Sequence, residues 1–267
     1  MEQLLLEETI DLKLLLQESR VKGGFQSNEL RRSIWPKLLR INRFERGNVV
    51  FVDGVGHRDK DQCSCDVERS FQTIHPGRSP RGLSTELILN RRLLLEKIIM
   101  TVLFNNSPHL YYYQGLNDIF AAVILVLQDE QLAFLTCEAI ALQYLSDYMH
   151  STFSAAAVIM SLIFKIIEEV DFELFTFIKS AEVEPFFATS WLVTWFSHDL
   201  KDLSKIARVF DCILTSTPLF SVYLCAAVVL HNRKGVMQCP PDIASVHSFL
   251  GTTNMYAITK IASSYVR

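Results

Sequence analysis

The chain has 267 residues, of which 49% are hydrophobic and 21% charged, with a net charge of −3. A chain of this length and apolar content can bury a large core, which excludes disorder over most of its length. The slightly acidic balance argues against broad nucleic-acid binding, so we expect no nucleic-acid partner.

The first half of the chain contains two strong helix signals. Ser27 can cap one helix, which we expect Pro36 to bend or end. Ser84 can cap a second helix. A broad apolar stripe follows it at the helical interval, made of Leu87, Leu89, Leu93, Leu94, Ile98, Val102 and Leu103. Two basic pairs, Arg31-Arg32 and Arg91-Arg92, lie on these helical patterns, and we interpret them as solvated faces.

Between these helices the evidence for strands is thin. Val49–Val52 is either a short strand or an extended connector. The polar span from Asp53 to Gly82 is rich in glycine and is the only long irregular region that we expect. Long irregular regions in compact domains tend to be functional.

Apolar residues recur at the helical interval throughout the second half of the chain. We expect helices at roughly 131–147, 154–169, 171–180, 185–197, 202–215 and 219–230. Two dense apolar stretches, Ile119–Leu127 and Leu219–Leu230, are shorter than the ~20 residues that a membrane span needs. We interpret them as buried helices. With no repeat and no linker, residues 1–267 are predicted to form a single all-α domain.

The termini and cysteines point to a reduced, cytosol-facing protein. The N-terminus carries acidic residues among leucines, which is not the pattern of a signal peptide. Cys137, Cys212 and Cys225 sit in apolar runs and should be small buried hydrophobes. Cys63-Ser64-Cys65 has no second Cys/His pair at zinc-ligand spacing, so we expect no metal site.

Asp66 and Arg69 are spaced to share one helix face. The simplest interpretation is a surface ion pair worth a few tenths of a kcal/mol. Arg69 also lies beside the long polar span, from which a side chain can be presented outward. Its planar fork of donors matches phosphate oxygens.

Gln114 follows three tyrosines at the edge of a predicted helix. The simplest interpretation is an amide that caps or crosses the helix start, although an amide can also accept from a water while donating to an oxyanion. Gly115 permits close approach of a partner backbone. Tyr111, Tyr112 and Tyr113 cannot all face one way, so at least one should pack inward.

No other catalytic apparatus is apparent. The histidines have no nucleophile-elbow pattern nearby, and the chain has neither a phosphate-loop lysine motif nor a dinucleotide glycine signature. The chain is therefore not expected to bind a nucleotide by itself. Arg69 and Gln114 would have to act on a nucleotide that another protein holds.

These motifs resemble the TBC domain, the helical module of Rab GTPase-activating proteins, over about residues 20–250. The family's first catalytic motif corresponds to Cys63-x-x-Asp66-x-x-Arg69, with cysteine where isoleucine is usual, and its second to Tyr112-Tyr113-Gln114-Gly115. Further family segments correspond to Leu30–Leu39, with its Arg-x-x-x-Trp pattern, to Phe187–Phe196 and to Arg208–Asp211.

The resemblance implies an all-α domain of roughly a dozen or more helices that accelerates GTP hydrolysis by a Rab GTPase in its GTP form. It implies that Arg69 is an arginine finger and Gln114 a glutamine that orients the attacking water, both supplied in trans. Asp66, Tyr112 and Gly115 would support them. GTP and Mg²⁺ would belong to the Rab, so the chain would be an activator without a cofactor of its own.

Ser180–Val183 and Asp242–His247 look most like an ER-anchored branch of the family that acts on early-secretory Rabs in vesicle trafficking. The branch implies a cytoplasmic location, with ER or Golgi membranes as the place where the protein would act. Membrane contact would be indirect or through a C-terminal helix that does not occur before Arg267, so either the chain is truncated or its location differs. A catalytically inert TBC-fold adaptor that binds Rab-GTP is the alternative function.

Overall fold

The computed structural model describes residues 12–21, 24–41, 49–72, 84–252 and 258. Its α-helices are α1 Leu12–Arg20, α2 Asn28–Leu38, α3 Lys60–Arg69, α4 Thr85–Asn105, α5 Leu116–Leu127, α6 Glu130–Ile140, α7 Ser154–Val170, α8 Phe172–Ser180, α9 Thr189–Val193, α10 Leu203–Leu214, α11 Phe220–His231, α12 Arg233–Val236 and α13 Ile243–Gly251. A π-helical turn, η2 Ala141–Leu145, and two 3₁₀ turns, η3 Ser146–Tyr148 and η4 Pro185–Ala188, complete the elements. These ranges contain no strand, and the all-α prediction is confirmed.

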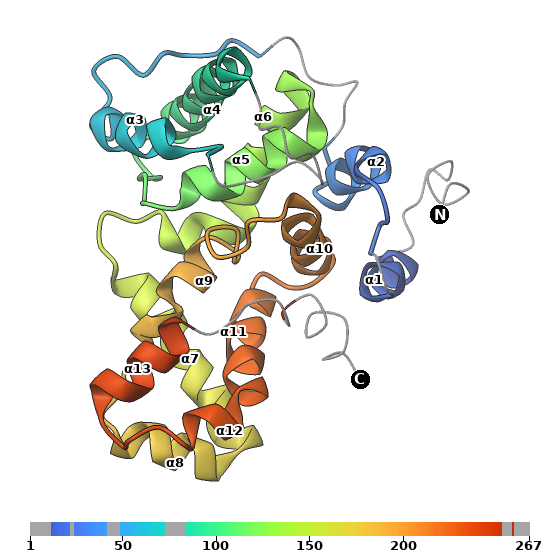
Figure 1. Cartoon of the computed structure of the whole chain (residues 1–267). Helices are drawn as coiled ribbons and strands as arrows, with labels where there is room; N and C mark the ends of the chain where they lie inside the picture. The colour runs from blue at the N-terminus through green and yellow to red at the C-terminus, as the bar shows by residue number, and fades with distance from the viewer. Residues whose placement is uncertain (1–11, 22–23, 42–48, 73–83, 253–257, 259–267) are drawn as a thin grey trace.

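The helices form an elongated stack (Figure 1). Helices α2 to α6 lie at one end, and α7, α8 and α11 to α13 lie at the other, with α9 and α10 between them. Helix α5 packs against α2, α3, α4, α6 and α10. It is buried along nearly its whole length, which explains why its sequence is apolar on every side.

Several local signals are confirmed. The Ser27 hydroxyl accepts from the Leu30 N–H at 3.3 Å, and the Ser84 hydroxyl accepts from the Leu87 N–H at 3.2 Å. Pro36 lies inside α2, which ends shortly after it at Leu38. Within the described residues, no helix combines the length and apolar character that crossing a bilayer requires.

The apolar stripe on α4 is buried only over its C-terminal half. Leu95, Ile98 and Leu103 are fully buried, whereas Leu87, Leu89 and Leu93 near the start of the helix are exposed. Helices α3, α5 and α6 make the main helix contacts with α4, and the first turns of α4 stay exposed.

The helix predicted at 185–197 is wrong in its second half. Helix α9 ends at Val193, and Trp195 and Phe196 adopt left-handed φ values of 50° and 63°. Both side chains are buried, and the Trp195 ring meets the Phe210 ring edge-on at 5.2 Å. Packing of the aromatic rings thus overrides the helical preference that the sequence pattern suggested.

The interpretation of Arg31 as part of a solvated face is also wrong. Arg31 is buried, and its Nη2 lies 2.8 Å from Asp211 Oδ2. The same carboxylate accepts from Trp35 Nε1 at 2.9 Å and from the Phe25 N–H at 3.2 Å. Burial raises the pKa of Asp211, and the hydrogen bonds and charge of Arg31 oppose that rise. The network joins α2 to α10, two segments far apart in the sequence.

The second basic pair is partly buried as well. Arg92 is half-buried, and its Nε donates to the Ser70 carbonyl at 3.2 Å. Arg91 is half-buried too, and its Nη1 is shielded from solvent without a hydrogen-bond partner among the described residues. The interpretation of this pair as a solvated face is therefore wrong as well.

The burial of the cysteines follows the prediction. Cys137, Cys212 and Cys225 are buried, and so is Cys63 at the position where the family usually has isoleucine. Burial raises the pKa of the Cys63 thiol to about 12, so this side chain remains a neutral packing group. Cys65, two positions further along α3, is exposed.

Candidate functional site

Helix α3 presents Arg69 at its C-terminal end. The helix lies inside the polar span from Asp53 to Gly82, and it contains the helical turn that the spacing of Asp66 and Arg69 predicts. Cys63 and Val67 bury one face of it against α4, and this apolar face accounts for a helix in an otherwise polar stretch. After Arg69 the chain turns away at Phe71, which has a φ of 65° and a buried side chain.

Arg69 and Asp66 form the predicted ion pair, with Arg69 Nη2 donating to Asp66 Oδ1. The two side chains differ sharply in exposure, because Arg69 is 66% exposed and Asp66 only 6%. A simple surface pair would expose both partners. Here the buried carboxylate holds one corner of the guanidinium and leaves its other donors available to an incoming group.

Tyr112 packs inward beneath this pair. Its hydroxyl lies 2.9 Å from Asp66 Oδ2 and 3.2 Å from Asn117 Oδ1. Burial raises the pKa of the Tyr112 phenol, with smaller contributions from Cys63 and Asp66, so the hydroxyl keeps its proton and can donate to the carboxylate. Tyr112 therefore fixes the position of the Asp66 carboxylate from the protein interior.

Gly115 immediately precedes α5 and has a conformation that favours glycine. Its φ is 112°, and a Cβ at this position would lie 2.8 Å from Thr194 Cγ2. The close neighbour is thus a side chain of the same protein, whereas the sequence suggested the backbone of a partner. Gln114 precedes this turn and is exposed.

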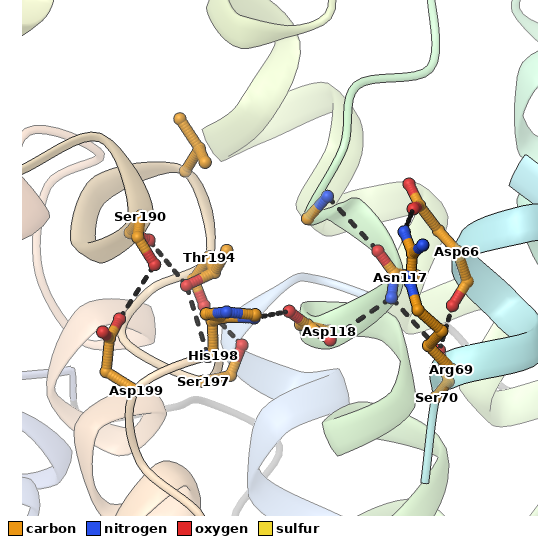
Figure 2. A network of polar contacts seen from close by, with 12 residues as sticks. Asp66, Arg69, Ser70, Asn117, Asp118, Ser190, Thr194, Ser197, His198 and Asp199 are labelled. Carbon is orange, nitrogen blue, oxygen red and sulfur yellow. Dashed lines mark hydrogen bonds and ion pairs between the residues drawn. The ribbon is translucent and has the colours of Figure 1, made fainter. Parts of the chain in front are cut away.

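Asn117 joins the two halves of the site, a role that the sequence analysis missed. Its Oδ1 accepts from the Gly115 N–H at 3.2 Å, and its Nδ2 donates to Ser70 Oγ at 3.1 Å. Ser70 follows Arg69, and Gly115 follows Gln114. One buried amide therefore ties together the two backbone segments that carry the exposed side chains (Figure 2). The signal available in the sequence for this role was a polar residue in an otherwise apolar helix.

The network continues from α5 to the segment after α9, which was also missed. Asp118 Oδ2 lies 2.9 Å from His198 Nδ1, and Figure 2 shows this contact bridging the two elements. The hydrogen bond to Asp118 is the main reason that the pKa of His198 is raised. Asp199 accepts from the Ser190 hydroxyl at 3.0 Å, and burial raises the pKa of Asp199.

The five predicted site residues therefore meet at one place. Arg69 and Gln114 are exposed, while Asp66, Tyr112 and Gly115 are buried next to them. Their roles in catalysis stay predictions.

The chain matches the family model described as the Rab-GTPase-TBC domain over residues 28–237. It is 37% identical over 252 residues to TBC1 domain family member 20 of Mus musculus, covering 93% of this chain and 60% of that protein. It is 32% identical over 245 residues to GTPase-activating protein gyp10 of Schizosaccharomyces pombe, covering 90% of this chain and 63% of that protein. The chain thus spans less than two thirds of these curated relatives.

Two solved structures share the fold. The Chlamydomonas flagellar RabGAP TBC domain has a TM-score of 0.69 at 16% identity, with 97% of this chain and 82% of that chain covered. The Ypt/Rab-GAP domain of Gyp1p has a TM-score of 0.63 at 14% identity, with 98% of this chain and 92% of that chain covered. The extension of one domain over residues 1–267 stays a prediction. The chain belongs to the Rab-GTPase-TBC domain family.

Proposed function

We propose that this chain is a GTPase-activating protein that accelerates GTP hydrolysis by a Rab GTPase in its GTP form. The observation that carries the proposal is the pair of exposed side chains, Arg69 and Gln114, on backbone segments that the Asn117 amide holds together. Family membership supports it, as does the name of the Schizosaccharomyces relative, a GTPase-activating protein.

Arg69 would act as the arginine finger. Phosphoryl transfer spreads negative charge over the phosphate oxygens, and a guanidinium can bridge two of them through its parallel donors. Asp66 would orient the guanidinium, and Tyr112 would hold Asp66 in place. Because an arginine has five N–H donors, the bond to Asp66 leaves enough of them for the phosphates.

Gln114 would orient the water that attacks the γ-phosphate. A side-chain amide accepts from the water through its oxygen and donates through its nitrogen, so it can align the nucleophile without taking its proton. Gly115 would serve this role indirectly, since only a glycine readily fits the turn that presents Gln114.

The remaining features of the proposal concern the partner. The nucleotide and its Mg²⁺ would be held by the Rab, and this chain would contribute no cofactor and would turn over nothing by itself. Early-secretory Rabs are the proposed substrates, which would place the protein at the cytoplasmic side of ER or Golgi membranes. Its membrane contact would be indirect or through a further segment of a longer protein.

A single-turnover assay of phosphate release tests the proposal across a panel of GTP-loaded Rabs. The chain should accelerate release from at least one Rab, and Arg69→Ala should remove about 10³- to 10⁵-fold of that acceleration. Gln114→Ala should slow release strongly as well, and intact activity would return the water-orienting role to the Rab. Binding of GTP-loaded Rabs without faster release would establish the inert adaptor instead.

A further inference from the structure

A cavity of about 620 Å³ lies between α1, α7 and α11, and none of the candidate site residues lines it. Its volume is typical of small-molecule sites, which span ~300–1,000 Å³. Most of the wall is aliphatic or aromatic, with Leu16 from α1, Ile166 and Val170 from α7, and Phe220 and Leu224 from α11. Such a wall favours an apolar ligand over a polar one.

One part of the wall is polar. Arg20 at the end of α1 and the connection Thr215–Thr217 between α10 and α11 line the cavity. The Ser19 hydroxyl lies 2.9 Å from Thr215 Oγ1, which places the end of α1 against this connection. Arg20 and the Thr215–Thr217 connection therefore lie next to each other in the wall.

Two of these polar groups lack a partner within the described part of the chain. Arg20 has no carboxylate at ion-pair distance there, and burial lowers the pKa of its guanidinium, which nonetheless stays charged. Ser216 Oγ is shielded from solvent and has no hydrogen-bond partner there. Thr215, in contrast, donates to the Asp211 carbonyl at 2.8 Å. A shielded hydroxyl does not reach a ligand in the cavity, so the unpaired Arg20 cation is the group that favours an anionic acceptor there.

We infer that this cavity binds an aliphatic chain that ends in an anionic headgroup. The headgroup would accept from Arg20, and the aliphatic chain would lie along the apolar wall formed by α7 and α11. Burying the aliphatic chain supplies the affinity, and the headgroup fixes the orientation. The inference is independent of the proposed function, since it involves neither Arg69 nor Gln114.

Fluorescence titration of the full chain with cis-parinaric acid tests the inference. We expect saturable binding that Arg20→Gln weakens about tenfold or more, because a hydrogen bond to a charged group is lost. Val170→Trp should abolish binding by filling the mouth of the cavity. Val170 is 63% exposed, so the larger side chain should not disturb the core.

Two matched controls separate the cavity from the rest of the surface. Val158→Trp adds the same ring to α7 at a residue that is 66% exposed and lies outside the cavity lining. Lys234→Gln removes one exposed cation from α12, away from the lining. Both controls should bind the probe like the wild type. Thermal unfolding followed by circular dichroism verifies that each variant is folded.

Further titrations identify the source of the ligand. Binding of the free fatty acid without sedimentation on phosphatidylserine vesicles indicates a soluble ligand, whereas sedimentation that requires Arg20 indicates a membrane lipid. The uncharged methyl ester should bind the wild type and Arg20→Gln equally. Absence of saturable binding, or unchanged binding by a folded Val170→Trp, would overturn the inference.

Discussion

Two arginine–aspartate pairs in this molecule have the same chemistry and opposite surroundings. In the pair of Arg31 and Asp211, both side chains are buried, with exposed fractions of 5% and 0%. In the pair of Arg69 and Asp66, the carboxylate is buried but the guanidinium is 66% exposed. In the first pair all three guanidinium nitrogens donate to side chains of the protein, Asp211 and Asn28, whereas the second pair keeps donors available to another molecule.

Burial of the guanidinium, and not the pairing itself, therefore separates a structural arginine from an available one. Both aspartates are further held by an aromatic side chain, Trp35 at Asp211 and Tyr112 at Asp66. Both are therefore well fixed. Only the exposed arginine can offer donors to another molecule while it keeps its aspartate partner.

Substitution of the exposed Arg69 should reduce GTPase activation more than any other change considered below. Arg69→Lys keeps the charge but loses the fork that bridges two phosphate oxygens, so GTPase activation should fall about 10³-fold or more. The free energy of unfolding should change by less than about 1 kcal/mol, because the side chain is exposed. Single-turnover phosphate release and urea unfolding measure the two quantities. Arg40→Lys, at an exposed arginine after α2, is the control and should change neither.

The buried arginine should show the opposite behaviour. Arg31→Met leaves the Asp211 carboxylate buried without its cation and should lower the free energy of unfolding by about 3–5 kcal/mol. Urea unfolding measures the loss. Adding Asp211→Leu should recover only part of it, since Trp35 Nε1 and the Phe25 N–H then lack their acceptor. A loss as small as that of Arg69→Lys would remove the distinction between the two pairs.

A smaller effect is expected at the turn that presents Gln114. Gly115→Ala places a Cβ at a φ of 112° and 2.8 Å from Thr194 Cγ2, which should cost about 1–3 kcal/mol of stability. Thr194→Ser removes that methyl group. In the double variant the loss should shrink but not vanish, because the backbone strain remains. Equal melting temperatures for Gly115→Ala and the wild type would show that the turn tolerates a side chain.

The smallest effect concerns pH. The hydrogen bond to Asp118 raises the pKa of His198 above its ordinary value of 6.5. The pair should therefore stabilise the fold fully below pH 6.5, and this contribution should be lost as the pH rises through the raised pKa. Because His198 is 67% exposed, solvent screening should keep the stabilisation from this pair below about 1 kcal/mol. Unfolding free energies between pH 5 and 8 should depend less on pH in Asp118→Asn.

Much of the local structure could be predicted because it depends on neighbours in the sequence. The capping serines Ser27 and Ser84 and the pairing of Asp66 with Arg69 involve residues three apart, and the structure contains all three interactions. The resemblance to the family predicted that Arg69 and Gln114 lie close together. The bonds of Asn117 to Ser70 and Gly115 agree with this prediction, because they hold the two backbone segments together.

The predictions that were wrong concern residues whose partners lie far along the chain. Arg31 looked solvated because its carboxylate partner, Asp211, lies in α10. Trp195 and Phe196 looked helical because their pattern does not reveal the aromatic cluster that turns the backbone there. Asn117 looked like one polar residue in an apolar helix. Its importance appears only when Ser70 and Gly115 are placed on either side of it.

The shared amide of Asn117 also bears on how the site opens and closes. Since both α3 and α5 depend on it, thermal fluctuations that break its bonds should release the ends of the two helices together. The site would then be either wholly assembled or wholly undone. Such all-or-none behaviour would spare the protein a half-formed surface that engages a partner without acting on it.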